Sequence, residues 1–353
     1  MRIAILGDGT LNHVRRWAGY FHDRGHEVLL LSFERTPDVP FASRRLRKLL
    51  PTRTAGYAAA AGGIRSILAG FRPDIVNAIY AGGYGFAAAL AGTGPLVVSA
   101  IGSDLLVDYP SSVFHRLQIG FALRRADLVT TDARVLTEAA VSAGARRDRV
   151  IEVVMGIDER IFHPPSGGGA GEGDIVIIST RNLHPVYDVG TMLDAFDLLA
   201  EDTGCRLVVC GDGPLRKDLE ERAASSAASR KIEFTGRLEP AELAGRLRSS
   251  DLYVSTSLSD STSVSLLEAM ACGAIPVVTD LPANREWIAD GVNGYLFRPG
   301  DPASLAGALG KAAADGGEEM VSRNLEAVRD RGSWSRNMAA AEEAFERLAG
   351  SVG

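Results

Sequence analysis

The chain contains the stretch DSTSVSLLEAMACGAIPVV at residues 260–278. It begins with an acid, Asp260, continues through hydroxyl side chains, and then becomes an apolar helical pattern that contains a second acid, Glu268. Small residues follow and lead into an apolar run that predicts a buried strand. We interpret the stretch as a loop, a helix and a strand of an α/β sheet.

The start of this predicted helix is a candidate phosphate site. The first N–H groups of a helix have no partner within it and carry partial positive charge, which favours a phosphate there. Asp260 and Glu268, on either side of that point, can accept hydrogen bonds from sugar hydroxyls. A nucleotide-sugar supplies both a diphosphate and hydroxyls. The alternative interpretation is a capped core helix with an exposed aspartate and a partnered glutamate.

The composition limits the class of protein. A chain of 353 residues with 46% apolar residues predicts one or two domains, and two are favoured. The net charge of −6 disfavours non-specific nucleic-acid binding, which needs a basic surface. Aromatic residues make up 7%, too few for a base-stacking platform. We therefore expect no nucleic-acid partner.

The cysteines and the apolar runs indicate in which cellular compartment the protein is expected. The three cysteines, Cys205, Cys210 and Cys272, show no metal-ligand spacing, and an odd count argues against a disulfide framework. No apolar run is long enough to span a bilayer, and the run that starts at Ile3 is better read as a strand than as an export signal. We expect a cytoplasmic protein.

Apolar runs alternate with helical patterns along the whole chain. This alternation, with uniformly apolar strands, predicts parallel sheets covered by helices on both faces. The predicted strands are Ile3–Leu6, Val28–Leu31, Ile75–Ala78, Leu96–Ala100, Leu128–Thr130, Val150–Val154, Ile175–Ser179, Arg206–Cys210, Ile232–Phe234, Leu252–Ser255 and Ile275–Val278. Predicted helices include Val14–Arg24, Val264–Ala271 and Arg285–Asp290.

A glycine-rich segment divides the pattern. Five of the ten residues 164–173 are glycine, which predicts an interdomain linker. We therefore predict doubly wound α/β domains at 1–163 and 174–333. The remaining segment, 334–353, is predicted to be a helix that packs back on the first domain. Ligands are expected at the carboxyl ends of the strands and in a cleft between the domains.

Several motifs together resemble a known family. They are Gly156-Ile157-Asp158, Arg181 after a strand, Gly211-Asp212-Gly213-Pro214, Ile232-Glu233-Phe234-Thr235-Gly236, and the acids Asp260 and Glu268 eight positions apart. With them the chain resembles the retaining family 4 glycosyltransferases, or group 1, of the GT-B fold. The resemblance implies two Rossmann-like domains, the first binding the acceptor and the second binding the nucleotide-sugar.

The chain departs from the family pattern at two places. The first acid is usually glutamate and is followed by glycine-aromatic-glycine, whereas this chain has Asp260 followed by Ser261, Thr262 and Ser263. The family usually has a lysine about six residues after the arginine, and Tyr187 stands there instead. Arg181 would then face the diphosphate without a second cation.

The resemblance assigns a role to each donor-site residue. Glu268 binds the ribose hydroxyls, and Asp260 contacts the transferred sugar. The backbone N–H groups of Ser263 and Val264 meet the distal phosphate, and Arg181 stabilises the charge on the leaving diphosphate. The predicted donor site is completed by Tyr187, Gly211, Ser261 and Thr262.

Three residues of the first domain are further candidates. Gly9 lies in a turn that lets the backbone approach a ligand, and His13 contacts a phosphate or the acceptor unless it is a structural histidine. Asp104 orients the acceptor hydroxyl or, alternatively, caps a helix.

The sequence also bears on membranes and metals. The basic stretch Ser43–Leu50 predicts either weak peripheral contact with an anionic lipid or phosphorylated acceptor, or a solvated helix face. No Asp-x-Asp pair or metal-spaced cluster occurs, so we expect neither a metal nor another cofactor.

We therefore predict a retaining glycosyltransferase that transfers a sugar to a small-molecule, glycan or lipid acceptor. A UDP-sugar is the first choice of donor, and GDP or another nucleotide is the second. Two other classes stay open: a different GT-B enzyme such as a nucleotide-sugar epimerase, and a non-catalytic nucleotide-sugar-binding protein.

Overall fold

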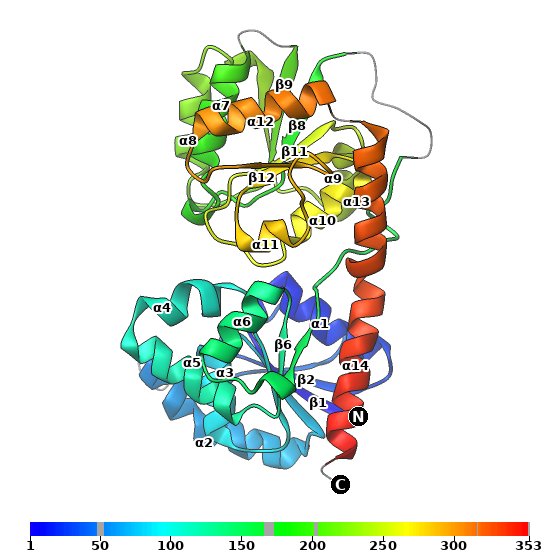
Figure 1. Ribbon diagram of the computed structural model, residues 1–353. Helices are drawn as coiled ribbons and strands as arrows, with labels where there is room; N and C mark the ends of the chain where they lie inside the picture. The colour runs from blue at the N-terminus through cyan, green and yellow to red at the C-terminus, as the bar shows by residue number, and fades with distance from the viewer. Residues whose placement is uncertain (48–52, 166–172, 201–203, 316, 352–353) are drawn as a thin grey trace. The chain divides into compact units, whose positions relative to one another are not determined.

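The computed structural model describes residues 1–353 except 48–52, 166–172, 201–203, 316 and 352–353 (Figure 1). The chain divides into two compact units. Unit 1 contains Met1–Val154 together with Met338–Gly353, and unit 2 contains Met155–Asn337. Each unit is built on its own parallel sheet.

Among the described residues, the sheet of unit 1 has seven strands. They are β1 (Arg2–Leu6), β2 (Glu27–Ser32), β3 (Ala42–Arg45), β4 (Ile75–Ile79), β5 (Leu96–Ser99), β6 (Leu128–Thr131) and β7 (Val150–Glu152). Their order in the sheet is β3-β2-β1-β4-β5-β6-β7, and every neighbouring pair is parallel. All five residues of β4 are buried, as expected where both faces of a parallel sheet are covered.

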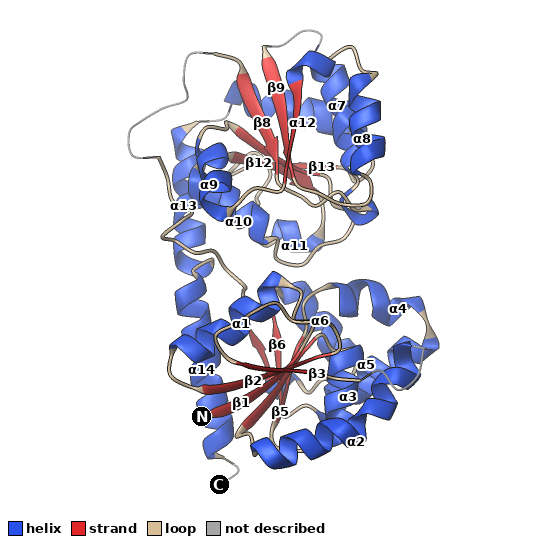
Figure 2. Ribbon diagram, turned by 180° about the vertical axis from the view of Figure 1, so that it is seen from behind, coloured by secondary structure: helices blue, strands red, loops and turns tan. Residues whose placement is uncertain are grey.

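Helices cover both faces of this sheet (Figures 1 and 2). They are α1 (Asn12–Asp23), α2 (Arg53–Phe71), α3 (Gly83–Ala91), α4 (Tyr109–Ser111), α5 (Val113–Arg125), α6 (Arg134–Ser142) and α14 (Trp334–Gly350), with short turns η1 (Asp104–Asp108) and η2 (Arg147–Arg149). Helices α2, α3 and α5 pack together, and α1 lies beside α14.

The described part of unit 2 has a six-stranded parallel sheet in the order β10-β9-β8-β11-β12-β13. The strands are β8 (Ile175–Ser179), β9 (Cys205–Cys210), β10 (Ile232–Gly236), β11 (Leu252–Ser255), β12 (Ile275–Thr279) and β13 (Tyr295–Phe297). The helices are α7 (Val189–Ala200), α8 (Arg216–Ala224), α9 (Pro240–Arg248), α10 (Val264–Cys272), α11 (Pro282–Arg285), α12 (Pro302–Asp315) and α13 (Glu318–Arg331), with turns η3 (Pro185–Tyr187) and η4 (Ser229–Lys231). The prediction of two doubly wound α/β domains is confirmed.

Each sheet has one point where the strand order reverses. In unit 1 this point lies between β1 and β4, and in unit 2 it lies between β8 and β11. The loops that follow two such strands diverge to opposite faces and leave a crevice at the carboxyl ends. The fold therefore places a natural ligand position at the end of each of these strand pairs.

Three sequence-based expectations about elements need correction. The basic stretch 43–50 is not a helix face at its start, because Ser43, Arg44 and Arg45 pair with β2 as edge strand β3; residues 48–50 lie outside the described residues. Strand β13 was not expected. The helix predicted at 285–290 instead begins at Pro282, whose fixed φ suits a first helical turn, and it ends at Arg285.

The boundaries between the units also differ from the expected ones. Unit 1 ends at Val154 instead of 163, because the segment that follows is held by unit 2. Ile157 forms a bridge with Ser333, and Arg248 donates a hydrogen bond to the carbonyl of Ile161. Most of the predicted linker, 166–172, lies outside the described residues.

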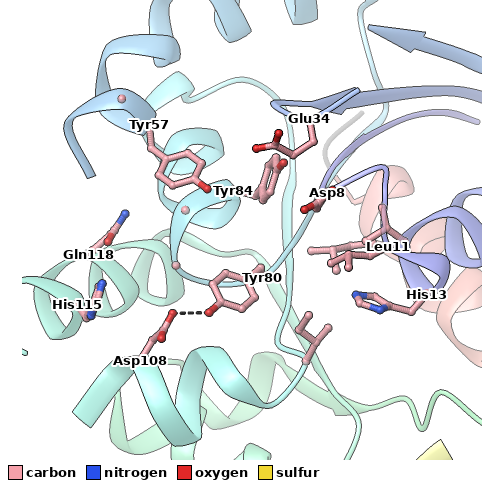
Figure 3. A pocket seen from close by; sticks show the side chains of 16 residues that line it. Asp8, Leu11, His13, Glu34, Tyr57, Tyr80, Tyr84, Asp108, His115 and Gln118 are labelled. Atoms are coloured by element: carbon pink, nitrogen blue, oxygen red, sulfur yellow. Dashed lines mark hydrogen bonds between the residues drawn. The ribbon is translucent and has the colours of Figure 1, made fainter. Parts of the chain in front are cut away.

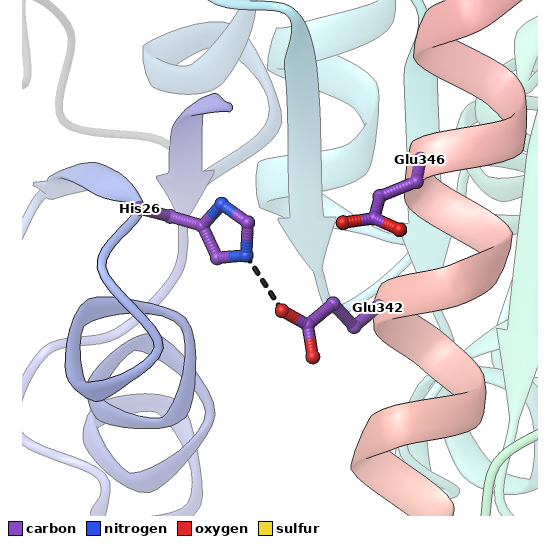
Figure 4. Close-up of side chains that lie close together, drawn as sticks. All are labelled: His26, Glu342 and Glu346. Atoms are coloured by element: carbon purple, nitrogen blue, oxygen red, sulfur yellow. Dashed lines mark hydrogen bonds and ion pairs between the residues drawn. The ribbon is translucent and has the colours of Figure 1, made fainter.

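Helix α14 is anchored on unit 1 by an aromatic stack and a buried carboxylate. The rings of Phe345 and Phe21 stack with centroids 5.2 Å apart. Glu342 accepts hydrogen bonds from Tyr20 at 2.9 Å and from Arg24 at 3.2 Å. It also accepts one from His26 at 2.8 Å, which Figure 4 shows. Burial alone would raise the pKa of Glu342, but these hydrogen bonds outweigh it and leave the pKa below its ordinary value.

Glu342→Ala is expected to destabilise unit 1 by about 2–3 kcal/mol, because it leaves the half-buried Tyr20 hydroxyl and the His26 N–H without an acceptor and removes the partner of Arg24. The exposed neighbour Glu343 is the matched control, and Glu343→Ala is expected to cost less than about 0.5 kcal/mol. Denaturant unfolding measures both. Equal effects in the two variants would contradict the anchoring role.

This contribution to stability also has a defined pH dependence. Because the pKa of Glu342 is lowered in the folded state, its contribution is complete above the ordinary glutamate pKa of about 4.3 and is lost as the pH falls through the folded-state value.

No helix of the described chain is both long and apolar enough to cross a bilayer.

Candidate functional site

The predicted donor-site residues of unit 2 converge where its strand order reverses. Arg181 follows β8, and Asp260 lies in the loop between β11 and α10. One guanidinium nitrogen of Arg181 donates to Asp260 Oδ2 at 2.7 Å. A second guanidinium nitrogen donates to Ser263 Oγ at 2.6 Å and to Ser265 Oγ at 2.9 Å. The structure thus brings together Arg181, Asp260 and the beginning of α10.

Ser263 is the N-cap of helix α10. It has an extended backbone, and its hydroxyl accepts a hydrogen bond from the N–H of Leu266. The N–H groups of Val264 and Ser265 have no hydrogen-bond acceptor among the described residues. They are the orphan donors that a helix N-terminus leaves, and they carry partial positive charge.

The electrostatics of this cluster favour an anion. A guanidinium at the positive end of a helix is unfavourable, so a negative group is needed beside it. In the structure Asp260 supplies that charge, with both side chains largely buried. Burial raises the pKa of the Asp260 carboxyl, and Arg181 opposes that rise without cancelling it. A diphosphate carries the charge that this arrangement accepts, with donors already in place.

Tyr187 contacts Arg181 directly. The guanidinium carbon of Arg181 lies 4.2 Å from the centroid of the Tyr187 ring, in a cation–π arrangement. Tyr187 closes turn η3, and its carbonyl accepts a hydrogen bond from Thr256 at 2.7 Å. Tyr187, which stands in place of the expected lysine, therefore adds no charge. Its ring instead packs against the guanidinium plane of Arg181 and helps to fix the orientation of that group.

Gly211 has a packing reason to be glycine. A Cβ there would lie 2.5 Å from the carbonyl oxygen of Arg181, and its φ of +156° is rarely adopted by other residues. The loop after β9 thereby approaches the backbone of Arg181. The structure thus gives Gly211 a supporting position beside the predicted donor residues.

The other predicted donor residues occupy α10 and the loop before it. Ser261 and Thr262 are buried, and Trp287 Nε1 donates to Thr262 Oγ1 at 3.5 Å. Glu268 is half-buried and lies on α10 beyond its first turn.

A pocket lies in unit 1, at the carboxyl ends of β1, β4 and β5. Its volume is about 330 Å³, and we refer to it as the unit 1 pocket (Figure 3). Its lining includes Asp8, His13 and Glu34 on one side and the Tyr80–Asp108 pair on another. Tyr80 donates a hydrogen bond to Asp108. The strands around this pocket flank the point where the strand order reverses.

His13 reaches this pocket from the first turn of α1. Its Nε2 atom is buried and has no hydrogen-bond partner among the described residues. Burial lowers the pKa of His13, with Asp8 opposing the shift, so the imidazole is neutral at neutral pH. A neutral imidazole with an unused nitrogen can bond a ligand hydroxyl.

Two other predicted residues of unit 1 make close contacts with the surrounding chain. Asp104 is fully buried, and its carboxylate accepts hydrogen bonds from the N–H groups of Ala81, Gly102 and Leu105. Burial raises the pKa of Asp104 to about 6, and the backbone donors oppose the shift. It is not among the described residues that line the pocket, and its expected contact with the acceptor stays a prediction.

Gly9 occupies a tightly packed position, and its expected contact with a ligand stays a prediction. Its N–H donates to Ser32 Oγ at 3.0 Å, and a Cβ would meet Thr36 at 2.1 Å.

Sequence reasoning missed several residues of both sites. Ser265 and Tyr253, whose hydroxyls are 2.9 Å apart, lie around Arg181, and Asp8 and Tyr80 line the unit 1 pocket. Tyr80 follows β4 directly and Asp8 lies two residues after β1, so the rule that ligands bind beyond strand ends is the signal that points to them. Nothing in the pattern indicates Tyr253, which reads as an ordinary buried strand residue.

One group of described side chains has metal-ligand types in proximity: His26, Glu342 and Glu346 (Figure 4). Glu342 is already an acceptor for three donors, and one is the cationic Arg24. A cation at this distance competes with a metal ion, so the group is better described as the anchor of α14.

Two family models match the chain. The model for glycosyl transferases group 1 matches residues 166–328, all within unit 2. The model for glycosyl transferase 4-like proteins matches residues 2–133 of unit 1.

Curated relatives match over part of the chain. It is 30% identical over 161 residues to the alpha-monoglucosyldiacylglycerol synthase of Streptococcus pneumoniae, covering 44% of this chain and 36% of that protein. It is 30% identical over 233 residues to the phosphatidyl-myo-inositol mannosyltransferase of Mycobacterium leprae, covering 62% of this chain and 61% of that one. The chain thus spans less than two thirds of either relative.

Solved structures share the fold over nearly the whole chain. Anabaena HepE in complex with UDP superposes with a TM-score of 0.79 at 17% identity, covering 98% of this chain and 100% of that chain. The sucrose-phosphate synthase of Thermosynechococcus elongatus gives 0.82 at 14% identity, covering 99% and 100%. The resemblance inferred from the sequence is confirmed: the chain belongs to the group 1 glycosyltransferases of the GT-B fold.

Proposed function

We propose that this protein transfers a sugar from a nucleoside-diphosphate sugar to an acceptor hydroxyl. One observation carries the proposal: Arg181 is bonded to the hydroxyls at the N-terminus of α10, so that a cation and free helix N–H groups converge. This combination matches a diphosphate leaving group, whose charge grows as the bond to the sugar breaks.

The donor roles follow from the positions of the side chains. The diphosphate occupies the beginning of α10, takes hydrogen bonds from the N–H groups of Val264 and Ser265, and replaces Asp260 as the main partner of Arg181. Asp260, released from that ion pair, accepts a hydrogen bond from a hydroxyl of the transferred sugar. Glu268, further along α10, accepts hydrogen bonds from the ribose.

A uridine nucleotide is our first choice. Anabaena HepE, which shares the fold, is described in complexes with UDP and with UDP-glucose.

The two curated relatives reported above are named for transfer to lipid acceptors. We assign the acceptor to the unit 1 pocket, because it is a small-molecule-sized cavity at the carboxyl ends of strands.

The proposed transfer breaks one bond to the anomeric carbon and forms another. The bond between the anomeric carbon and the diphosphate oxygen breaks, and the acceptor oxygen forms a bond to the same carbon. The acceptor oxygen bonds to the anomeric carbon on the same face that the diphosphate leaves, so the configuration is retained. The proton of the acceptor hydroxyl passes to the departing phosphate. Arg181 and the helix N–H groups stabilise the negative charge on the nucleoside diphosphate.

The proposal is tested by measuring UDP release from a panel of nucleotide-sugars, with and without added glycosides. Slow hydrolysis of at least one donor, together with a rise in melting temperature with its nucleoside diphosphate, is the expected result. A melting-temperature rise without release of nucleotide from any donor would favour a non-catalytic binding protein. An epimerase would convert the donor sugar without transferring it.

Glu268→Ala is expected to weaken UDP binding about tenfold or more, because the ribose loses a charged acceptor of hydrogen bonds. Isothermal calorimetry measures the change. The matched control is Glu242→Ala, which removes an exposed glutamate from α9 and is expected to leave the affinity unchanged. Equal affinities in wild type and Glu268→Ala would remove Glu268 from the donor site.

A further inference from the structure

The unit 1 pocket is built from segments that are distant in sequence. Asp8 follows β1, Tyr80 follows β4 and Ile101 follows β5, while α2, α3 and α5 contribute other side chains. The volume of about 330 Å³ is at the lower end of the range for small-ligand sites. It is therefore large enough for a compact ring and lies entirely within one unit.

Aromatic rings form part of its wall. Tyr57 and Tyr84 have ring centroids 5.8 Å apart with planes tilted by 57° (Figure 3). The chain makes room for them with glycine, because a Cβ at Gly83 would lie 2.3 Å from the Tyr57 ring. The hydroxyl of Tyr84 accepts a hydrogen bond from the N–H of Phe33 at 3.2 Å, which fixes that ring.

Tyr80 occupies the pocket in a strained backbone conformation. Its φ is +89°, which is an outlier for a bulky residue. Gly82 lies against its ring, since a Cβ at Gly82 would approach the Tyr80 ring to 3.1 Å. Strain of this kind persists where the surroundings impose it, and it clusters at ligand sites. The strained backbone of Tyr80 therefore supports a ligand site independently of the charges of the pocket.

The charge of the pocket has one sign. Asp8, Glu34 and Asp108 contribute carboxylates, and no lysine or arginine occurs among the described residues that line it. Asp8 Oδ1 accepts two hydrogen bonds from Thr10, and Asp108 accepts one from Tyr80. An anionic ligand would be repelled, whereas a cation gains both from the carboxylates and from the aromatic faces.

From these observations we infer that the unit 1 pocket binds a saccharide ring that carries a protonated amine, in preference to a phosphorylated ring. The inference rests on the proposed function, in which this ring is the acceptor. Ring hydroxyls meet the carboxylates and the unused Nε2 of His13, and the amine lies among the acids and tyrosines. This preference for an amine distinguishes the protein from a transferase whose acceptor headgroup is a phosphate ester.

The test compares two probes that differ only at one substituent, methyl 6-amino-6-deoxyglucoside and methyl glucoside 6-phosphate. Ligand-detected NMR titration of the full chain, without donor, gives both dissociation constants. We expect the amino probe to bind at least about tenfold more tightly. Equal binding, or tighter binding of the phosphate, would overturn the inference.

Two isosteric changes locate the effect. In the double variant Asp8→Asn and Glu34→Gln, the preference is expected to fall below about threefold, with an unchanged melting temperature. The control is Asp23→Asn, which removes the same charge from an exposed position on α1 outside the pocket. A preference that stays tenfold in the double variant would contradict the assignment.

The same samples distinguish this inference from the proposed function. A UDP titration and a donor-hydrolysis assay report on unit 2 and do not need the acceptor. If the protein binds and hydrolyses the nucleotide-sugar but does not bind the amino probe more tightly than the phosphate probe, only the pocket assignment is overturned. Absence of nucleotide binding and turnover would instead overturn the proposed function.

Discussion

Arg181→Ala is expected to lower the rate of sugar transfer by about 10²–10³-fold, or about 2.7–4 kcal/mol of transition-state stabilisation. Arg181 is the cation that the structure places at the N-terminus of α10. The position often occupied by a second cation in relatives holds Tyr187, whose ring stacks on the guanidinium without contributing charge. The effect should therefore fall mainly on kcat, because charge on the diphosphate grows as the bond breaks.

Arg181→Lys distinguishes charge from geometry. Lysine keeps the charge but lacks the planar fork that reaches Asp260, Ser263 and Ser265 together. We expect it to recover only part of the rate. The control is Arg206→Ala, which removes an exposed arginine from β9 in the same unit. A transfer rate in Arg181→Ala equal to that of the control would contradict the proposed role.

Loss of Arg181 also leaves Asp260 buried without its ion-pair partner, which is expected to destabilise unit 2 by about 3–5 kcal/mol. A buried carboxylate without a cation binds a proton more readily in the folded state than in the unfolded chain. Stability of the variant should therefore increase as the pH falls from about 8 to about 5. Melting curves across this range separate loss of folding from loss of catalysis.

Asp260→Ala is expected to strengthen UDP binding while lowering turnover. In the structure the Arg181 guanidinium donates a hydrogen bond to Asp260 Oδ2 at 2.7 Å, so a diphosphate must displace this carboxylate. Removing this competitor and its negative charge favours the nucleotide, by up to about tenfold. The transferred sugar loses its charged hydrogen-bond acceptor, so transfer should fall by about tenfold or more.

In this variant the affinity for UDP is expected to rise while turnover falls. Calorimetry should give a smaller Kd for UDP, and the transfer assay should give a smaller kcat. Asp218→Ala, at an exposed position on α8, is the control for removal of a charge from unit 2. Weaker UDP binding in Asp260→Ala would show that this carboxylate supports the nucleotide instead of competing with it.

Much of the fold could be predicted because its strands are continuous apolar runs. The run Val28–Leu31 has no polar residue, and only a buried parallel strand explains that pattern easily. The edge strand Ala42–Arg45 was missed because all four of its side chains are exposed, so it carries no apolar signal. Its identity comes from pairing with β2, which the local sequence does not encode.

The donor site was more predictable than the pocket of unit 1. Asp260 and Ser263 are close in sequence, and the motif that contains them also contains the helix start. The pocket depends on side chains such as Tyr57, Tyr80 and Asp108, which only tertiary structure brings together. The positive φ of Tyr80 is imposed by its surroundings, and a tyrosine in a sequence gives no sign of it.

The role of Asp104 is difficult to predict for a related reason. An acid at the end of a strand suggests a ligand contact, but here the chain folds around it and supplies backbone N–H donors to its carboxylate. Sequence position alone does not distinguish these outcomes, because both place the acid beyond a strand.

The most direct test of the account is the crystal structure of the protein with bound UDP. We expect the distal phosphate within hydrogen-bond distance of the N–H groups of Val264 and Ser265, with Arg181 turned from Asp260 to the diphosphate. UDP bound elsewhere, with the Arg181–Asp260 ion pair intact and the start of α10 unoccupied, would contradict it.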